Sequence, residues 1–167
     1  VCALTVGKKK YADVQELAIE SQKKGNELKA QFVDVIDRDT EAFNAVSAVF
    51  AMPKDTDEEK AARKAAMQEA LKGCTKTPFE MMELACQALE LTRSVVGKLN
   101  ASAASDLGCA ALSLKAAIQG AWLNVLINIG GIQDQAFADE YRQKGQALLD
   151  KALPLADAIY QEVLESL

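Results

Sequence analysis

Asp39 is the residue of this sequence best suited to acid–base chemistry, because it interrupts an apolar stripe. Stepping by three or four residues, as along one face of a helix, the stripe comprises Leu28, Phe32, Val35, Ile36, Asp39, Phe43, Val46 and Phe50. A carboxyl group surrounded by apolar side chains has a raised pKa unless it is partnered, and a raised pKa suits proton transfer near neutral pH. The alternative is that Asp39 pairs with a buried amide or a helix cap and has only a structural role.

A second unusual line of residues lies between positions 106 and 128. Its members are all small or polar, whereas the other faces of the same segment are apolar: Asp106, Ala110, Ser113, Ala117, Gly120, Asn124 and Asn128. Such a seam either packs closely against another helix or borders a polar ligand, since amides in apolar surroundings need hydrogen-bond partners. Ser105 or Asp106 can also act simply as the N-cap of this segment.

Lys8, Lys9 and Lys10 form a basic cluster beside Tyr11 in a chain whose net charge is −5. Three successive lysines are usually solvated. Their functional alternative is an anchor for an anionic ligand, with Tyr11 available to stack on a ring.

The sequence lacks the residues that several kinds of functional site require. The chain has no histidine, and its four cysteines show no metal-ligand spacing, so we expect no zinc site. Nucleophilic catalysis has little support because no histidine is present to activate a serine or cysteine, and no glycine-rich phosphate loop occurs. The acidic balance argues against a nucleic-acid partner, and unpaired thiols fit the reducing cytoplasm.

These side chains must be positioned by helices, because no alternating strand pattern is found. We predict a single all-α, up-and-down domain over residues 1–167, with about five long helices and its uncharged helix at the centre. We expect the chain to open partway through a helix that ends at Gly7. The expected helices after it are 12–51, 56–73, 77–96, 106–129 and 134–167, the last bent at Pro154.

Two of these boundaries rest on capping boxes. Thr56 with Glu59, and Thr77 with Glu80, have the spacing of a capping box, and Pro78 would occupy the first helical position of the second. The uncharged stretch 116–133 approaches the length of a membrane span, but polar residues and glycines interrupt it, so we expect a helix buried in protein and no membrane partner.

Five segments together resemble the cyclodeaminase family of one-carbon folate enzymes. They are TVGKKKY, VIDRDTEAFNAV, MPKDTDEEKAARKAAMQEAL, NASAASDLGCAAL and WLNVLINI, and their spacing is collinear over essentially the whole chain. The resemblance implies an all-helical domain, usually dimeric, that acts on tetrahydrofolate derivatives without a metal or redox cofactor. Family members usually have a Gly/Ser-rich stretch and a helix before the point where this sequence starts, so folate contacts from that part are expected to be missing.

The resemblance also implies roles for individual residues. Asp39 falls at the position of the family's proposed catalytic aspartate. Substrate contacts are implied for Lys8, Lys9, Lys10, Tyr11, Ser105, Asp106, Asn124 and Asn128. We expect the three lysines to hold the glutamate tail of the folate, because a flexible polyanion suits exposed ammonium groups.

The leading functional hypothesis is a cytoplasmic, homodimeric formimidoyltetrahydrofolate cyclodeaminase. This enzyme converts 5-formiminotetrahydrofolate to 5,10-methenyltetrahydrofolate and ammonia. The first alternative is a methenyltetrahydrofolate cyclohydrolase, which adds water at the same bridging carbon and forms 10-formyltetrahydrofolate. The less favoured alternative is a helical interaction module without catalytic activity, in which Asp39 and the amide seam are only structural.

Overall fold

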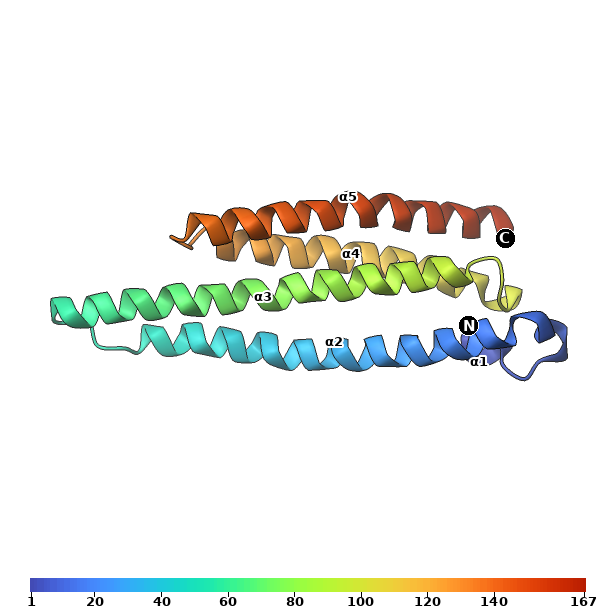
Figure 1. Cartoon of the computed structure of the whole chain (residues 1–167), viewed down its shortest axis with the longest axis horizontal. Coiled ribbons are helices and arrows are strands. Elements are labelled where there is room, and N and C mark those ends of the chain that lie inside the picture. Colours follow the sequence, from blue (N-terminus) through green and yellow to red (C-terminus); the bar gives the residue numbers. More distant parts are fainter.

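The computed structural model describes residues 1–167 and contains helices but no strands. Its α-helices are α1 (Cys2–Thr5), α2 (Gln15–Phe50), α3 (Asp57–Val95), α4 (Ala104–Ile129) and α5 (Gln135–Ser166), with 3₁₀ turns at Lys9–Val14 and Ala101–Ala103. The four long helices run up and down in an elongated bundle, and both chain ends lie near the same end of it (Figure 1). The predicted all-α class and up-and-down arrangement are confirmed.

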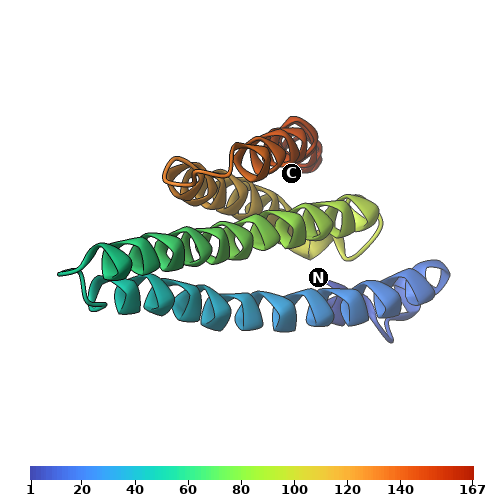
Figure 2. The ribbon, with the colours of Figure 1, turned by 60° about the vertical axis from the view of Figure 1, so that its left-hand side comes forward.

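The centre of the bundle is α3, not the uncharged helix α4 as the sequence predicted. Helix α3 contacts α2, α4 and α5, whereas α2 and α4 hardly touch each other. Helix α2 packs on one side of α3, and the pair formed by α4 and α5 packs on the other (Figure 2). Side chains of α2 and of α4 can therefore both contact the central helix α3, from its two sides.

The predicted break between residues 73 and 77 is wrong, because α3 continues through Gly73 and Pro78. The two residues that resembled a capping box have other partners. The Thr77 hydroxyl donates to Asp39 on α2, and Glu80 accepts from Arg38 on α2. Contacts with a neighbouring helix thus occupy the side chains that would otherwise have started a new helix.

The other predicted helix boundaries agree with the structure to within a few residues. Helix α2 ends just before Met52 and Pro53, and the Thr56–Glu59 capping box starts α3. Asp134 caps α5 by accepting from the backbone N–H of Phe137, and α5 continues through Pro154. Gly7 has a φ of 75°, a left-handed conformation that suits glycine, and it separates α1 from the next turn.

Close packing of α4 against α5 depends on two glycines. A Cβ atom at Gly145 would lie 2.0 Å from the ring of Trp122, and one at Gly108 would lie 3.2 Å from Val163. The small and polar seam of α4 plays no such part, since a Cβ at Gly120 would meet nothing within 4 Å. Close packing was one of the two alternatives for that seam, and the close contact with α5 is made by a different face of α4.

Helix α4 is less buried than the sequence suggested. The segment Ala101–Ile129 is long and apolar enough to cross a membrane by length and composition alone. Of the 18 residues that form its most apolar stretch, 22% are buried in the chain. One face packs against α3 and α5 through Leu107, Ala111, Ile118 and Val125, while the opposite face leaves Leu123 and Ile127 exposed.

Candidate functional site

Asp39 does not lie in the core of the single chain, which corrects the expectation drawn from the apolar stripe. The stripe is wider than the surface that α3 covers. Its Leu28, Val35 and Val46 are buried, whereas Ile36 and Phe43 are 55% and 65% exposed, and Asp39 is exposed beside them. The carboxylate therefore lies at the edge where α2 meets α3, open to solvent on one side.

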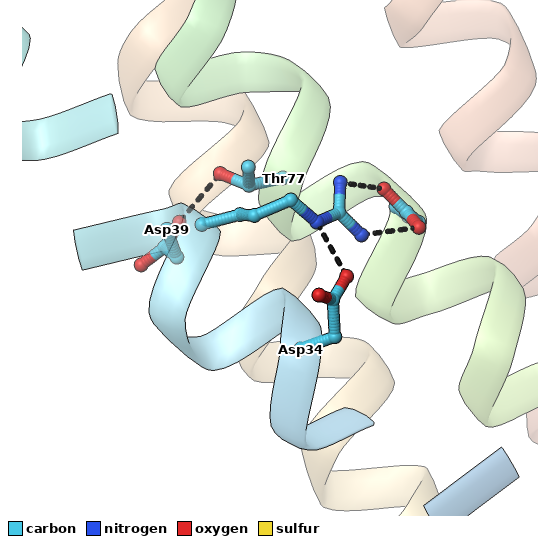
Figure 3. A network of polar contacts seen from close by, with 5 residues as sticks. Asp34, Asp39 and Thr77 are labelled. Carbon is cyan, nitrogen blue, oxygen red and sulfur yellow. Dashed lines mark hydrogen bonds and ion pairs between the residues drawn. The ribbon is translucent and has the colours of Figure 1, made fainter. Parts of the chain in front are cut away.

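One hydrogen bond fixes the Asp39 side chain. The Thr77 hydroxyl donates to Asp39 Oδ1 at a distance of 2.6 Å. Figure 3 shows the two side chains pointing toward each other. Thr77 is buried, and it differs from Thr75 and Thr92 of the same helix, whose hydroxyls donate to carbonyls four residues earlier in α3. The hydroxyl of Thr77 thus orients one carboxylate oxygen and leaves Oδ2 without a partner from the chain.

A charged clamp holds α2 and α3 together next to this pair. Arg38 donates to both carboxylate oxygens of Glu80 on α3, at 2.8 and 2.6 Å, and to Asp34 one turn earlier on α2 at 2.7 Å. The hydrogen bonds to Glu80 and then Asp34 raise the pKa of Arg38 above its already high usual value. Because the clamp includes the residue adjacent to Asp39, it sets the register of α2 on α3 at the site (Figure 3).

The opposite side of this stretch of α3 is contacted by α4. Pro78 has no N–H to donate to the carbonyl of Cys74, four residues earlier, and Asn128 Nδ2 donates to that carbonyl at 2.8 Å instead. Burial raises the pKa of the Cys74 thiol, and the nearby charge of Asp39 adds to the effect. Asp39 and Asn128 therefore contact the same turn of α3, from α2 and from α4 respectively, and Asn124 is one turn before Asn128 on α4.

The remaining predicted site residues lie at the other end of the bundle. The helical rise puts the start of α2, Gln15, about 36 Å from Asp39. Lys8, Lys9 and Lys10 precede that helix, and Tyr11 anchors their segment through hydrogen bonds with Asn100 and Ala101. Within one chain these lysines and Tyr11 do not lie near Asp39.

Ser105 and Asp106 belong to the same distant group, in the first turn of α4. By the same helical rise, Asp106 lies about 33 Å from Asn128. Asp106 is not an N-cap, because the cap position is Ala103 and no side chain caps this helix. The nine predicted site residues thus form two groups, with Asp39, Asn124 and Asn128 in the first.

Thr77, Arg38 and Cys74 were missed as members of the site. For Thr77 a signal was present, since a threonine followed by proline inside an amphipathic pattern can lie within a helix, but its spacing from Glu80 favoured the cap. No sequence signal pairs Arg38 with Glu80, which is 42 residues away along the chain.

Comparison with known proteins identifies the family of this chain. The sequence profile of the family described as formiminotransferase-cyclodeaminase matches residues 1–147. A methenyltetrahydrofolate cyclohydrolase of Methylorubrum extorquens is 40% identical over 163 residues, which cover 98% of this chain and 78% of that protein.

Two further proteins are similar. The formimidoyltransferase-cyclodeaminase of Sus scrofa is 34% identical over 123 residues, which cover 74% of this chain but 23% of that longer protein. The crystal structure of formiminotetrahydrofolate cyclodeaminase from Thermotoga maritima superposes with a TM-score of 0.78 at 26% identity, covering all of this chain and 77% of the other. The chain therefore belongs to the formiminotransferase-cyclodeaminase family of one-carbon folate enzymes.

Proposed function

We propose that the chain is a methenyltetrahydrofolate cyclohydrolase, with Asp39 as the proton-transfer residue. The observation that carries the choice of reaction is the 40% identity across nearly the whole chain to the M. extorquens protein of that name. The comparisons thus favour the first alternative over the cyclodeaminase reaction that the sequence analysis put first. They give no support to a non-enzymatic interaction module.

The proposed reaction adds one water across the bridge between the two folate nitrogens N5 and N10. Asp39 takes a proton from the water while the water oxygen forms a bond to the cationic bridging carbon. The protonated Asp39 then returns that proton to N5 as the carbon–N5 bond breaks. The added hydroxyl loses its own proton to solvent and becomes the carbonyl of 10-formyltetrahydrofolate, so the reaction releases one proton in total.

The geometry around Asp39 suits this role. Oδ1 is held by Thr77, so Oδ2 has a fixed direction and is free to accept a proton. The Nδ2 groups of Asn124 and Asn128 donate to backbone carbonyls, so the carboxamide oxygens of both residues are available to the polar edge of a pterin ring. The proposal needs no metal or redox cofactor, and unpaired buried thiols at Cys74 and Cys86 are in keeping with a cytoplasmic location.

The cyclodeaminase reaction remains the second candidate, because the T. maritima structure of that name covers all of this chain. In that reaction the N10 nitrogen attacks the formimino carbon, and ammonia leaves after it receives a proton. Both reactions act on the same carbon and need one group that moves a proton, so Asp39 fits either.

A side-by-side assay separates the two reactions. Purified protein is mixed with 5,10-methenyltetrahydrofolate in one experiment and with 5-formiminotetrahydrofolate in the other, and the methenyl absorbance is followed. We expect enzyme-dependent loss of the methenyl compound, with 10-formyltetrahydrofolate as product. If methenyltetrahydrofolate instead accumulates from the formimino substrate and is not consumed, the cyclodeaminase is the correct assignment.

We also propose that the functional unit is a homodimer. Large apolar side chains stay exposed on α2 and α4: Val33, Ile36, Phe43, Phe50, Leu112, Leu123 and Ile127. Exposed apolar side chains in such number mark an interaction surface. A second copy that covers this surface would enclose Asp39 as well, and the distant group formed by Lys8, Lys9, Lys10, Tyr11, Ser105 and Asp106 can reach a substrate at Asp39 only from such a second copy.

A further inference from the structure

Pro78 leaves a carbonyl of α3 free to bind a side chain of another helix. Proline has no N–H, and its ring crowds the carbonyl of the residue four positions earlier, which here is Cys74. The side chain that donates to this carbonyl is Asn128 of α4, through Nδ2 at 2.8 Å. The other proline within a helix, Pro154 of α5, differs, because no side chain donates to the carbonyl of Asp150.

Both amide hydrogens of Asn128 are engaged within the chain. Nδ2 lies 2.8 Å from the Cys74 carbonyl oxygen and 2.8 Å from the backbone carbonyl oxygen of Asn124. A carbonyl oxygen can only accept, so the carboxamide atom that contacts both carbonyls must be the nitrogen. The carboxamide oxygen of Asn128 is therefore turned away from both, and no group of the chain donates to it.

Asn124 has a similar arrangement one turn earlier on α4. Its Nδ2 donates to the carbonyl of Gly120 at 3.1 Å, so its carboxamide oxygen is also left as an acceptor. Asn124 is exposed and Asn128 is half-buried, so a ligand can reach both oxygens. Asn128 offers a ligand only an acceptor, and Asn124 adds a second acceptor beside it. The pair therefore favours a ligand edge that carries hydrogen-bond donors.

These acceptors lie at the turn of α3 that carries the Asp39 site. Asp39 accepts from Thr77, which follows Cys74 by one turn of α3. In a folate whose bridging carbon lies at Asp39, the pterin ring is next to that carbon, because N5 belongs to both the ring and the bridge. The edge of the ring away from the bridge presents two neighbouring donors, N3–H and the 2-amino group.

We propose that Asn128 accepts a hydrogen bond from the donor edge of the pterin ring, and that Pro78 is the positioning residue that fixes the Asn128 carboxamide for this role. The inference rests on the proposed function, since it takes the substrate to be a folate whose reacting carbon lies at Asp39. Pro78 does not contact the substrate and acts through the carbonyl of Cys74. The acceptor is ordered before the ligand arrives, so binding costs less side-chain entropy.

A binding cycle tests the inference with the wild type, Pro78→Ala, Asn128→Ala and the double variant. Alanine at position 78 supplies an N–H to the Cys74 carbonyl and removes the ring that crowds it, so Asn128 loses its anchor but keeps its own chemistry. Pro154→Ala is the matched control, because it changes a proline within α5, a helix that carries no residue of the Asp39 site. Calorimetry gives the Kd of folinic acid, and circular dichroism checks that each variant is folded.

We expect Asn128→Ala to weaken folinic acid binding by about three- to tenfold, which corresponds to one lost hydrogen bond. Pro78→Ala alone should weaken binding by about threefold, but in the Asn128→Ala background it should leave Kd unchanged, because Pro78 acts only through Asn128. Pro154→Ala should match the wild type. Equal effects of Pro78→Ala in both backgrounds, or an equal loss in Pro154→Ala, would overturn the proposal.

Two analogues of folinic acid test which atoms Asn128 recognises. The 2-desamino-2-methyl analogue lacks the 2-amino donor, and the 3-methyl analogue lacks N3–H. At least one should bind the wild type about tenfold more weakly than folinic acid does, and its penalty should be smaller in Asn128→Ala. If both analogues show the same penalties in the two proteins, Asn128 does not bind the donor edge and the proposal is overturned.

Turnover separates this inference from the proposed function. Because Pro78 affects binding of the pterin, Pro78→Ala should raise KM and leave kcat within about twofold of the wild type. If the wild type shows the expected binding cycle but does not turn over 5,10-methenyltetrahydrofolate, the proposed function fails and the pterin contact stands. If the wild type is an active cyclohydrolase and Pro78→Ala lowers only kcat, the inference fails alone.

Discussion

At the scale of single residues, the site depends on a buried hydroxyl that is aimed out of its own helix. Thr77 donates to Asp39, whereas Thr75 and Thr92 of the same helix donate to backbone carbonyls. A carboxylate at the surface has many orientations available, and this bond selects one of them. Thr77 is therefore a positioning residue for Asp39.

Replacing Thr77 by valine should lower kcat without weakening substrate binding. Valine keeps the shape but removes the donor, and a hydrogen bond to a charged group contributes about 1.5–3 kcal/mol, so a fall in kcat of about tenfold or more is expected. Steady-state kinetics should give a KM within about twofold of the wild type, because the hydroxyl contacts Asp39 and not the substrate. Thr77→Ser should restore most of kcat, and a valine variant with unchanged kcat would show that the hydroxyl does not position Asp39.

Asp39 could be picked out from the sequence as a candidate proton-transfer residue, but its surroundings could not be predicted. A carboxylate within an apolar stripe is visible as a pattern. Which edge of the stripe a neighbouring helix covers is decided by the packing angle, so the pattern could not tell that Val35 is buried while Ile36 is 55% exposed. Whether a site is open or enclosed depends on which helices pack over it, and the periodicity of apolar residues does not identify those helices.

At the scale of helices, Pro78 shows how a neighbour can rescue an interrupted helix. Proline leaves the carbonyl of Cys74 without its helical donor, and Asn128 of α4 supplies one. Thr77 and Glu80 meanwhile bond to α2. The sequence around Pro78 has every local mark of a helix start, so the continuity of α3 could be found only from contacts with residues far along the chain.

A double-mutant cycle tests this compensation. Asn128→Ala leaves the buried Cys74 carbonyl unpaired and should lower the free energy of unfolding by about 1–3 kcal/mol. Pro78→Ala restores a backbone N–H that can donate to the same carbonyl, so Asn128→Ala should cost less in that background. Urea unfolding of the four proteins gives both costs, and equal costs would mean that Asn128 does not replace the missing helical bond.

Contact between α4 and α5 offers a second test at this scale. Gly145→Ala would place a Cβ 2.0 Å from the Trp122 ring, so we expect a loss of about 1–3 kcal/mol or more in stability as the helices move apart. Gly73→Ala is the matched control, because nothing lies within 4 Å of its Cβ position and alanine favours a helix by about 0.5–1 kcal/mol. Thermal unfolding distinguishes them, and similar shifts for both variants would contradict the packing argument.

At the scale of the whole molecule, the exposed apolar faces of α2 and α4 predict a homodimer. Sedimentation at micromolar concentration should give a dimer for the wild type and a shift toward monomer for Phe43→Glu, whose side chain is 65% exposed. Leu164→Glu makes the same kind of change on α5, where the side chain is 52% exposed, and should remain dimeric. A wild type that sediments as a monomer would contradict the prediction.

The architecture was the part of this protein most open to prediction from sequence. Proline at position 53, the Thr56–Glu59 box and Asp134 each act locally, so the ends they mark were found to within a few residues. Which helix is central, and which of the nine predicted site residues meet, depends on how long helices are placed side by side. That information is absent from local signals, and it divided the predicted site into two groups about 36 Å apart along α2.

The most direct test of the account is kcat of the Asp39→Asn variant on 5,10-methenyltetrahydrofolate, measured beside Asp37→Asn as a control on the same helix. Asparagine can still accept the Thr77 hydrogen bond, so the fold and folinic acid binding should persist, but it cannot carry the proton. We predict a fall in kcat of about a hundred- to ten-thousand-fold for Asp39→Asn and near wild-type turnover for Asp37→Asn. A folded Asp39→Asn enzyme that binds folate and retains most of its kcat would contradict the assignment of Asp39 as the proton-transfer residue.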